Sequence, residues 1–241
     1  MQIDISQLAQ EAVLELSTVN DLVRWGVSRF NESDVYFGHG TDNPWDESAA
    51  LVAFALNLPP FLNADLLAAK LTKSERQLAV ELIMERIQSR KPASYITNLA
   101  YFCGLPFYVN EDVLVPRSPI GELIQGRFEG LINSEPTQIM DLCTGSGCIA
   151  IAMAKQFPHA AVDALDISPE ALAVAEENIY RLGVQEQVIP VMSDIFSGVM
   201  GQKYDLIVSN PPYVDAEDLG DMPEEFHHEP EIGLGSGADG L

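Results

Sequence analysis

The chain has 241 residues, 47% of them hydrophobic, which is enough for one large or two ordinary domains with their own cores. Its 13 lysines and arginines against 36 aspartates and glutamates give a net charge of −23, which disfavours nucleic acid as the main partner because phosphate-binding proteins present a basic face. The charge would attract a basic protein, and general solubility explains it equally well. Three cysteines without a CxxC pair predict neither a disulfide framework nor a zinc site.

The start of the chain and its hydropathy bear on localisation. The opening stretch, MQIDISQLAQEAVLEL, lacks the basic segment and the continuous apolar segment of a signal peptide. No apolar run approaches the length that crosses a bilayer. We therefore expect a globular, cytoplasmic protein with no membrane partner.

Residues 1–92 are expected to form a helical domain. Apolar residues at helical spacing predict a helix from Ile5 to Leu16, and Ser17 or Thr18 can cap a second helix that ends near Phe30. A third helix is expected to begin at an Asp46 cap, and a fourth at a Thr72–Glu75 capping box. The apolar stripe of the fourth helix consists of Leu78, Leu82, Ile83 and Ile87.

Residues 93–118 are rich in aromatic and β-branched residues and contain turn signals, among them Gly104-Leu105-Pro106. This pattern predicts a β-hairpin that links two domains. A helix is expected to follow from Pro119 to about Asn133.

Residues 119–241 carry the pattern of an α/β domain. Strands and helices alternate in the order QIMDL, IAIAMAKQF, AVDALD, SPEALAVAEENIYRLG, QVIPVMSD and KYDLIVSN. This order is typical of a doubly wound, Rossmann-like parallel sheet, and its fourth strand, at 204–208, is expected to be fully buried. Only four strands precede residue 241 and EPEIGLGSGADGL resembles a loop, so the sheet is expected to be truncated after its fourth strand.

A glycine-rich turn between the first strand and the next helix is a candidate binding element. Gly145 and Gly147 permit positive φ and leave no Cβ in the way of a ligand. Asp166, about twenty residues further on, is placed to receive two ribose hydroxyls, or it caps the helix that follows Ser168. The spacing is formally GxGxxA, so nicotinamide and flavin remain possible cofactors beside S-adenosylmethionine. After the third strand, Asp194 offers an acceptor to an adenine, and Ile195 and Phe196 beside it offer an apolar wall, although Asp194 can also be a helix cap.

The fourth strand ends in Asn210-Pro211-Pro212-Tyr213, although prolines cannot extend a sheet ladder. In this architecture such a turn projects into the crevice at the carboxyl ends of the strands, beside the glycine turn. The prolines stiffen the turn, so the side-chain oxygen of Asn210 and the carbonyl of Pro211 can receive an NH₂ group while Tyr213 stacks on a planar amide or base.

Together these motifs resemble a known family. DLCTGSGCIAIA and SNPPY are similar to class I methyltransferases that act on planar NH₂ nitrogens, and VLVPRSPIGELI narrows the resemblance to protein glutamine N5-methyltransferases. FGHGTDNPWDE is similar to the branch that methylates the third protein of the large ribosomal subunit, a sister group of the release-factor enzymes. The resemblance spans essentially the whole chain.

The resemblance implies a cofactor, S-adenosylmethionine, and a helical domain that recognises the substrate. It implies catalytic roles for Asn210, Pro211 and Tyr213, which with Pro212 and Arg117 would also bind the substrate glutamine. The cofactor-binding set that it implies consists of Asp141, Cys143, Thr144, Gly145, Ser146, Gly147, Asp166, Asp194, Ile195 and Asn210.

The expected partner is a basic ribosomal protein, because acidic residues crowd Asp215 to Glu231 and no lysine or arginine follows Lys203. A solvated acidic loop explains the same pattern. The alternatives are a release-factor methyltransferase, an adenine-N6 nucleic-acid methyltransferase, a nicotinamide oxidoreductase and a non-catalytic ribosome-binding module. His227 and His228 lie among glutamates, but their spacing matches no known metal site.

Overall fold

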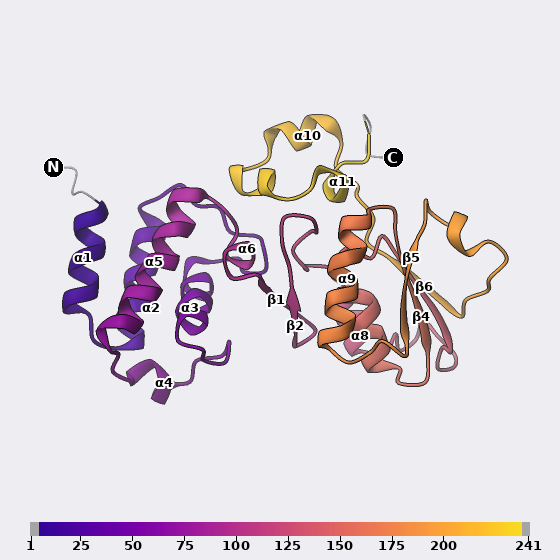
Figure 1. Ribbon diagram of the computed structural model, residues 1–241, viewed down its shortest axis with the longest axis horizontal. Helices are drawn as coiled ribbons and strands as arrows, with labels where there is room; N and C mark the ends of the chain where they lie inside the picture. Colours follow the sequence, from indigo (N-terminus) through magenta and orange to yellow (C-terminus); the bar gives the residue numbers. More distant parts are fainter. Residues whose placement is uncertain (1–4, 238–241) are drawn as a thin grey trace. The chain divides into compact units, whose positions relative to one another are not determined.

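The computed structural model describes residues 5–237 (Figure 1). The chain divides into two compact units. The first runs as far as Thr97 and also contains Pro223–Glu225, whereas the second comprises Asn98–Met222 and the residues from Phe226 onward. Residues 1–4 and 238–241, which belong to the expected domains 1–92 and 119–241, lie outside the described part of the chain.

The first unit is helical, and the four expected helices are confirmed. Thr18 and Thr72 each close a capping box at the start of a helix. The expected cap at Asp46 is wrong, because the Asn43 side chain accepts the Asp46 N–H and the helix already begins at Pro44. The helices are α1 (Ile5–Glu15), α2 (Val19–Asn31), α3 (Pro44–Ala55), α4 (Ala64–Ala68), α5 (Lys73–Ser89) and α6 (Ala93–Thr97).

The core of the helical unit lies between α2, α3 and α5. The expected stripe on α5 is only partly correct, since Leu78 is 51% exposed. A charged residue takes a core position instead, because the Arg86 side chain is 1% exposed and its Nε donates to Glu47 of α3 at 2.5 Å. Hydrophobic patterning does not register such a pair. The apolar side chains that α5 buries are Ala79, Val80, Ile83 and Met84.

The second unit begins with the expected hairpin, in which β1 (Leu99–Phe102) pairs antiparallel with β2 (Leu105–Tyr108). Asn178 of α9 (Pro169–Arg181) fastens the hairpin, because its side chain accepts the Tyr108 N–H at 2.7 Å and donates to the Tyr108 carbonyl at 2.9 Å. The expected helix to Asn133 is too long: α7 spans only Ile120–Gln125. It ends there because Arg127 and Phe128 both adopt a φ of 52°, outside the helical region.

A parallel sheet of four strands forms the centre of the second unit, which confirms the expected α/β fold. The strands are β3 (Gln138–Leu142), β4 (Ala161–Asp166), β5 (Val188–Met192) and β6 (Leu206–Ser209). Their order is β5-β4-β3-β6. The chain thus extends from β3 in one direction and returns to its other side with β6, which creates a topological switch point between these two strands.

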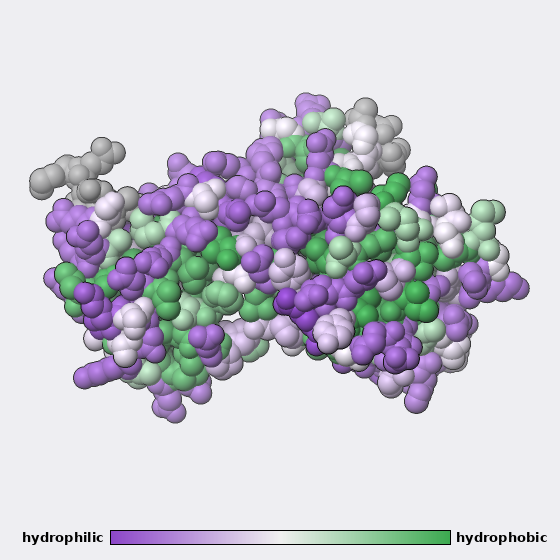
Figure 2. All heavy atoms as spheres, in the orientation of Figure 1, coloured by the Kyte–Doolittle hydropathy of each residue, from purple (hydrophilic) through white to green (hydrophobic). Residues whose placement is uncertain are grey.

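Helices α8 (Cys148–Gln156) and α9 cover one face of the sheet (Figure 1). The expectation of a fully buried fourth strand is wrong, because β6 lies at an edge of the described sheet and Ile207 is 52% exposed. Ile189 of β5, at the opposite edge, is 54% exposed. Figure 2 shows hydrophobic atoms at the surface in the region of these strands.

Beyond β6 the chain leaves the sheet and then returns to pair with Val214, which lies shortly after β6. The excursion contains α10 (Ala216–Asp221), the 3₁₀ helix η2 (Glu224–His228) and α11 (Glu231–Leu234). The Val214 N–H donates to the Leu234 carbonyl and the Ser236 N–H donates to the Val214 carbonyl, both at 3.0 Å. We call residues 229–236 the return segment. The helix α11 thus occupies part of the stretch 229–241, which was expected to be a loop, and residues 238–241 of that stretch lie outside the described part of the chain. The expectation of missing strands stays a prediction.

Candidate active site

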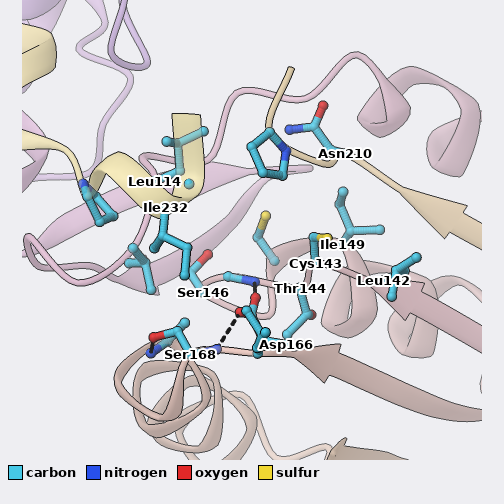
Figure 3. A pocket seen from close by; sticks show the side chains of 18 of the residues that line it. Leu114, Leu142, Cys143, Thr144, Ser146, Ile149, Asp166, Ser168, Asn210 and Ile232 are labelled. Carbon is cyan, nitrogen blue, oxygen red and sulfur yellow. Dashed lines mark hydrogen bonds between the residues drawn. The ribbon is translucent and has the colours of Figure 1, made fainter. Parts of the chain in front are cut away.

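The switch point brings the candidate residues of three strands together. Leu142 of β3 lies opposite Ser209 of β6, so the residues that follow them, Cys143 and Asn210, share one edge of the sheet. Both line a single cavity of about 340 Å³, and Asp166 lines it as well (Figure 3). This volume is within the usual range of small-molecule sites.

The glycine turn supplies one wall of the cavity. Gly145 has a φ of 53°, and a Cβ at this position would meet nothing within 4 Å, so its backbone faces open space. Gly147 was expected to contact a ligand, but it does not line the cavity. It has a φ of 77°, and a Cβ at this position would lie 3.2 Å from the Cβ of Ala175, so this glycine allows close packing. Cys143 also has a left-handed backbone, with a φ of 62°.

Two cysteines line the cavity as neutral thiols. Burial raises the pKa of Cys143 and raises that of Cys148 to about 12. Because the thiolate is the nucleophilic form of cysteine, neither residue is suited to covalent catalysis.

Asp141 was expected to bind the cofactor, but it lies behind the turn and does not line the cavity. Its Oδ2 accepts the Thr144 hydroxyl at 2.6 Å and the Ala150 N–H at 3.0 Å. Burial, opposed by these two hydrogen bonds and assisted by the charge of Asp166, raises the pKa of Asp141 to about 7. Asp141 therefore supports the turn from within the core, whereas Thr144 and Ser146 do line the cavity.

Asp166 lies at the end of β4 and is oriented by two backbone donors. Its Oδ2 accepts the Gly145 N–H at 2.8 Å and its Oδ1 accepts the Ser168 N–H at 3.0 Å. The helix-cap alternative for Asp166 is wrong, because the cap of α9 is Ser168, whose hydroxyl accepts the Ala171 N–H. Each carboxylate oxygen has a second lone pair that can receive a ligand hydroxyl.

After β5, Asp194 and Ile195 form a further part of the lining. Ile195 is 59% exposed and has a φ of 49°, which is unusual for a β-branched residue. The buried Ser193 holds this conformation, because its hydroxyl donates to the Ile195 carbonyl at 2.8 Å and accepts the Gly198 N–H at 2.9 Å. Ser193 was not among the residues predicted for the site, although its place directly after a strand was a usable signal.

Only two of the four residues in the Asn-Pro-Pro-Tyr turn line the cavity. Asn210 and Pro212 line it, whereas Pro211 and Tyr213 are outside the lining. The Tyr213 side chain is 72% exposed, so its ring is accessible to a substrate. The hydroxyl of Ser209 donates to the Leu142 carbonyl at 2.7 Å and ties the start of the turn to β3.

Arg117 lines the cavity, but its guanidinium group is already engaged. Nη1 donates to Oε1 of Glu229 at 2.7 Å and Nη2 donates to Oε2 at 2.5 Å. Glu229 was not predicted as a site residue, because in sequence it is one acid among many in the stretch from Asp215 to Glu231. One signal was available in the sequence. No lysine or arginine lies near Glu229, so if this acid is buried, its cationic partner must be distant in sequence.

Two kinds of site have no support in the described part of the chain. Within residues 5–237 no cluster of three or more His, Cys, Asp or Glu side chains is arranged to hold a metal ion, and this includes the His227-His228 pair. In the same range, no helix combines the length and the apolar character needed to span a bilayer.

The chemistry of the lining fits a nucleoside with a cationic or polar extension. Asp166 offers acceptors for ribose hydroxyls, Ile195 and Ile167 offer apolar surface for a base, and Gly145 leaves room for a ligand against its backbone. Asn210, on the far side of the glycine turn, offers an amide oxygen to a second molecule. The site is therefore suited to joining a nucleoside cofactor with a polar substrate.

Comparisons with known proteins agree with this arrangement. The family described as the methyltransferase small domain matches residues 128–229. The ribosomal protein uL3 glutamine methyltransferase of Francisella tularensis subsp. tularensis (strain SCHU S4 / Schu 4) is 43% identical over 237 residues, which are 98% of this chain and 76% of that relative. The protein of the same name from Neisseria gonorrhoeae (strain ATCC 700825 / FA 1090) is 48% identical over 233 residues, which are 96% of this chain and 78% of that relative.

Among solved structures, a ribosomal protein L11 methylase from Lactobacillus delbrueckii subsp. bulgaricus is 32% identical and covers 49% of this chain and 58% of its own, with a TM-score of 0.34. Neither curated name points to a release factor or to a nucleic acid.

Proposed function

We propose that this chain, which belongs to the family of ribosomal protein uL3 glutamine methyltransferases, methylates the side-chain nitrogen N5 of a glutamine in uL3. S-adenosylmethionine would be the methyl donor. The observation that carries the proposal is that Asn210 and the glycine turn line one cavity at the switch point of the sheet. The nicotinamide alternative leaves the Asn-Pro-Pro-Tyr turn without a role.

The cofactor would be held by the residues that follow three strands. The turn residues from Cys143 to Ser146 receive the methionine portion, and Asp166 accepts the ribose hydroxyls. Asp194 and Ile195 receive the adenine, the first as an acceptor and the second as an apolar wall. When bound, the sulfonium cofactor supplies an activated methyl group.

The Asn-Pro-Pro-Tyr turn would align the substrate amide with that methyl group. An amide nitrogen is a poor nucleophile because its lone pair is delocalised, so position matters more than a strong base. The Asn210 side-chain oxygen and the Pro211 carbonyl accept the two N–H groups, while the accessible ring of Tyr213 stacks on the amide plane.

In the transfer, the N–C bond forms as the C–S bond breaks, and the nitrogen then releases one proton to water. The two acceptors stabilise the positive charge that develops on the nitrogen. Alignment of this kind is worth up to about 7–11 kcal/mol in favourable cases.

The test is to locate the transferred methyl group. The protein is incubated with isotopically labelled cofactor and a mixture of undermodified uL3, release factors and nucleic acid, and the label is mapped by mass spectrometry. We expect N5-methylglutamine in uL3. Label in a release factor or a nucleic acid contradicts the substrate. Calorimetry that detects a nicotinamide cofactor and no S-adenosylhomocysteine contradicts the cofactor.

A further inference from the structure

An ion pair between Arg117 and the buried Glu229 lies against the cavity, which Arg117 lines. The Glu229 side chain is 0% exposed, and its carboxylate receives both terminal nitrogens of Arg117. Oε1 also accepts the Val115 N–H at 3.0 Å. On its other side, the Arg117 guanidinium lies 5.4 Å from the centre of the Phe226 ring. A two-pronged pair of this kind fixes orientation as well as distance.

The pair joins two walls of the cavity that are far apart in sequence. Val115 and Arg117 belong to the wall that follows the hairpin, whereas Ile232 belongs to the return segment. In Figure 3, Ile232 and Leu114 lie together, on the side of the cavity away from Asp166.

The two walls also touch directly. A Cβ at Gly233 would lie 3.2 Å from Cδ1 of Leu114, so the return segment packs closely on the segment that contains Leu114. The ion pair and this contact therefore join the same two segments.

The return segment also holds the backbone of the substrate-binding turn. The Leu234 carbonyl accepts the N–H of Tyr213 at 3.2 Å and the N–H of Val214 at 3.0 Å. Leu234 is the last residue of the short helix α11, which begins two residues after Glu229. A shift at Glu229 is therefore transmitted over about one helical turn to the residue that stacks on the substrate.

Net stability alone does not explain why this site carries a charge pair whose carboxylate is buried and whose guanidinium group is only partly exposed. Desolvation of two charges offsets most of their attraction, and an apolar pair of similar volume is often as stable or more stable. What the ion pair adds is a defined geometry between two segments.

We propose that Arg117 and Glu229 form a positioning pair, which sets the return segment so that Ile232 closes the cofactor cavity and Leu234 holds Tyr213. The reaction that the pair serves rests on the proposed function. The position of the cavity wall and of the Tyr213 backbone can be tested without any methyl transfer.

Two variants and a matched control test the proposal on the full chain. Glu229→Gln removes the charge and one acceptor, and Arg117→Lys keeps the charge but loses the two-pronged geometry. Glu231→Gln makes the same charge change on an exposed side chain of the same segment. The measurements are amide hydrogen exchange by NMR and the affinity for S-adenosylhomocysteine by calorimetry.

For both variants of the pair we expect exchange at the Tyr213 and Val214 amides to rise by about tenfold or more, and affinity to fall by about tenfold, since a hydrogen bond to a charged group is lost. The control should match the wild type. Arg117→Lys keeps the experiment decisive if Glu229→Gln fails to fold.

Two results would overturn the proposal. The first is exchange at Tyr213 and Val214 within about twofold of wild type in Arg117→Lys. The second is a rise of equal size at core amides such as Ile151, because a merely stabilising pair acts on all amides through global unfolding. If the wild type methylates no uL3, the proposed function fails, yet the exchange data still decide the role of the pair.

Discussion

Asp141 illustrates how a buried carboxylate shapes the site at the scale of one residue. It holds the glycine turn through Oδ2, while its Oδ1 is buried and has no hydrogen-bond partner among the described residues. Its pKa in the folded protein is about 7, mainly because of burial, against an ordinary value of 3.8. The folded state therefore retains a proton that the unfolded state releases, and the ionised form opposes folding.

The raised pKa of Asp141 predicts how the stability of the protein depends on pH. As pH rises from 3.8 to about 7, the ionisation of Asp141 should lower the stability of the wild type. Asp141→Asn should remove this loss, because the asparagine keeps an oxygen for Thr144 and Ala150 but does not ionise. We expect the free energy of unfolding of the variant, relative to wild type, to increase by more than ~1 kcal/mol between pH 4 and pH 8. Urea titrations at both pH values measure it. A difference that is constant with pH would show that Asp141 has an ordinary pKa.

At the residue scale, the sequence predicted which side chains gather but not how each one is used. Asp166 and Asn210 were predicted at the cavity because parallel strands end at a common edge, and that reasoning needs only the order of the strands. Glu229 and Ser193 were missed because their partners are set by the course of loops. Asp141 was assigned to the cofactor because sequence does not distinguish the inside of a turn from its outside.

At the scale of elements, the turn between β3 and α8 contains two glycines with different tasks. Gly145 faces open space, whereas Gly147 lies against Ala175 of α9. Gly147→Ala should therefore destabilise the fold by about 1–3 kcal/mol, through strain at positive φ and a close contact. Gly145→Ala should cost about 1–2 kcal/mol from its φ alone, and its methyl group enters the cavity.

The two glycine variants are separated by comparing stability with ligand affinity. Gly145→Ala should lower the affinity for S-adenosylhomocysteine by about tenfold or more. Gly147→Ala should lower this affinity less than Gly145→Ala does, relative to the stability that each variant loses. Chemical denaturation and calorimetry on both proteins provide the data. The assignment is wrong if Gly147→Ala has the larger effect on affinity.

Helix α10 carries exposed acids, which are the basis for the proposed attraction of a basic substrate. Glu217, Asp218 and Asp221 are exposed, whereas Glu225 and Glu229 of the same acidic stretch are buried in ion pairs. Neutralising the three exposed acids as Glu217→Gln, Asp218→Asn and Asp221→Asn leaves the Asp215 cap intact. Asp215 accepts the backbone N–H groups of Glu217 and Asp218, which these substitutions keep.

We expect the triple variant to associate with uL3 about tenfold more slowly at low salt, and the difference to shrink at high salt, because screening removes long-range attraction. Stopped-flow association over a series of salt concentrations checks this. Association rates of the wild type that do not depend on salt would remove the steering role and leave a solvated acidic helix.

Elements with a strong local signal were predicted well. The capping boxes of α2 and α5, the hairpin and the strand-helix alternation all depend on neighbours in sequence. The expected end of α7 and the expected burial of β6 failed for a different reason. A left-handed Arg127 and an edge position for β6 depend on packing and strand order, which the local pattern does not contain.

At the scale of the whole molecule, the chain completes its helical unit with residues from near its end. Glu225 is fully buried there, where it accepts from Nη1 of Arg86 at 3.3 Å, Nε of Arg90 at 2.7 Å and the Tyr36 N–H at 2.9 Å. Burial alone would raise its pKa, but the hydrogen bonds from Arg90 and Tyr36 and the charge of Arg86 hold the pKa below its ordinary value of 4.5. The helical unit therefore depends on a residue more than a hundred positions away.

Removal of this charge should be costly. Glu225→Gln leaves the buried Arg86 under-compensated, so we expect a loss of about 3–5 kcal/mol in the free energy of unfolding. The neighbouring Glu224, whose side chain is 65% exposed, is the control, and Glu224→Gln should change stability by less than about 0.5 kcal/mol. Because the pKa of Glu225 is lowered on folding, its contribution should be present above pH 4.5 and disappear as pH falls below it.

Denaturation curves of both variants at pH 7 and pH 3.5 test this account. Equal losses for Glu225→Gln and Glu224→Gln at pH 7 would contradict it. No sequence pattern predicted that residues 223–225 belong to the helical unit, because a buried acid and an exposed acid look alike in a run of acids. The division of the whole chain into units thus required the structure.

The central claim is that Asn210 holds the substrate amide beside the methyl group bound at the glycine turn. The most direct measurement is the single-turnover rate of uL3 methylation by Asn210→Ala at saturating cofactor, together with its affinity for S-adenosylhomocysteine. We expect the rate to fall by about 100-fold or more while the affinity changes by less than about threefold. A rate within about threefold of wild type would contradict the claim.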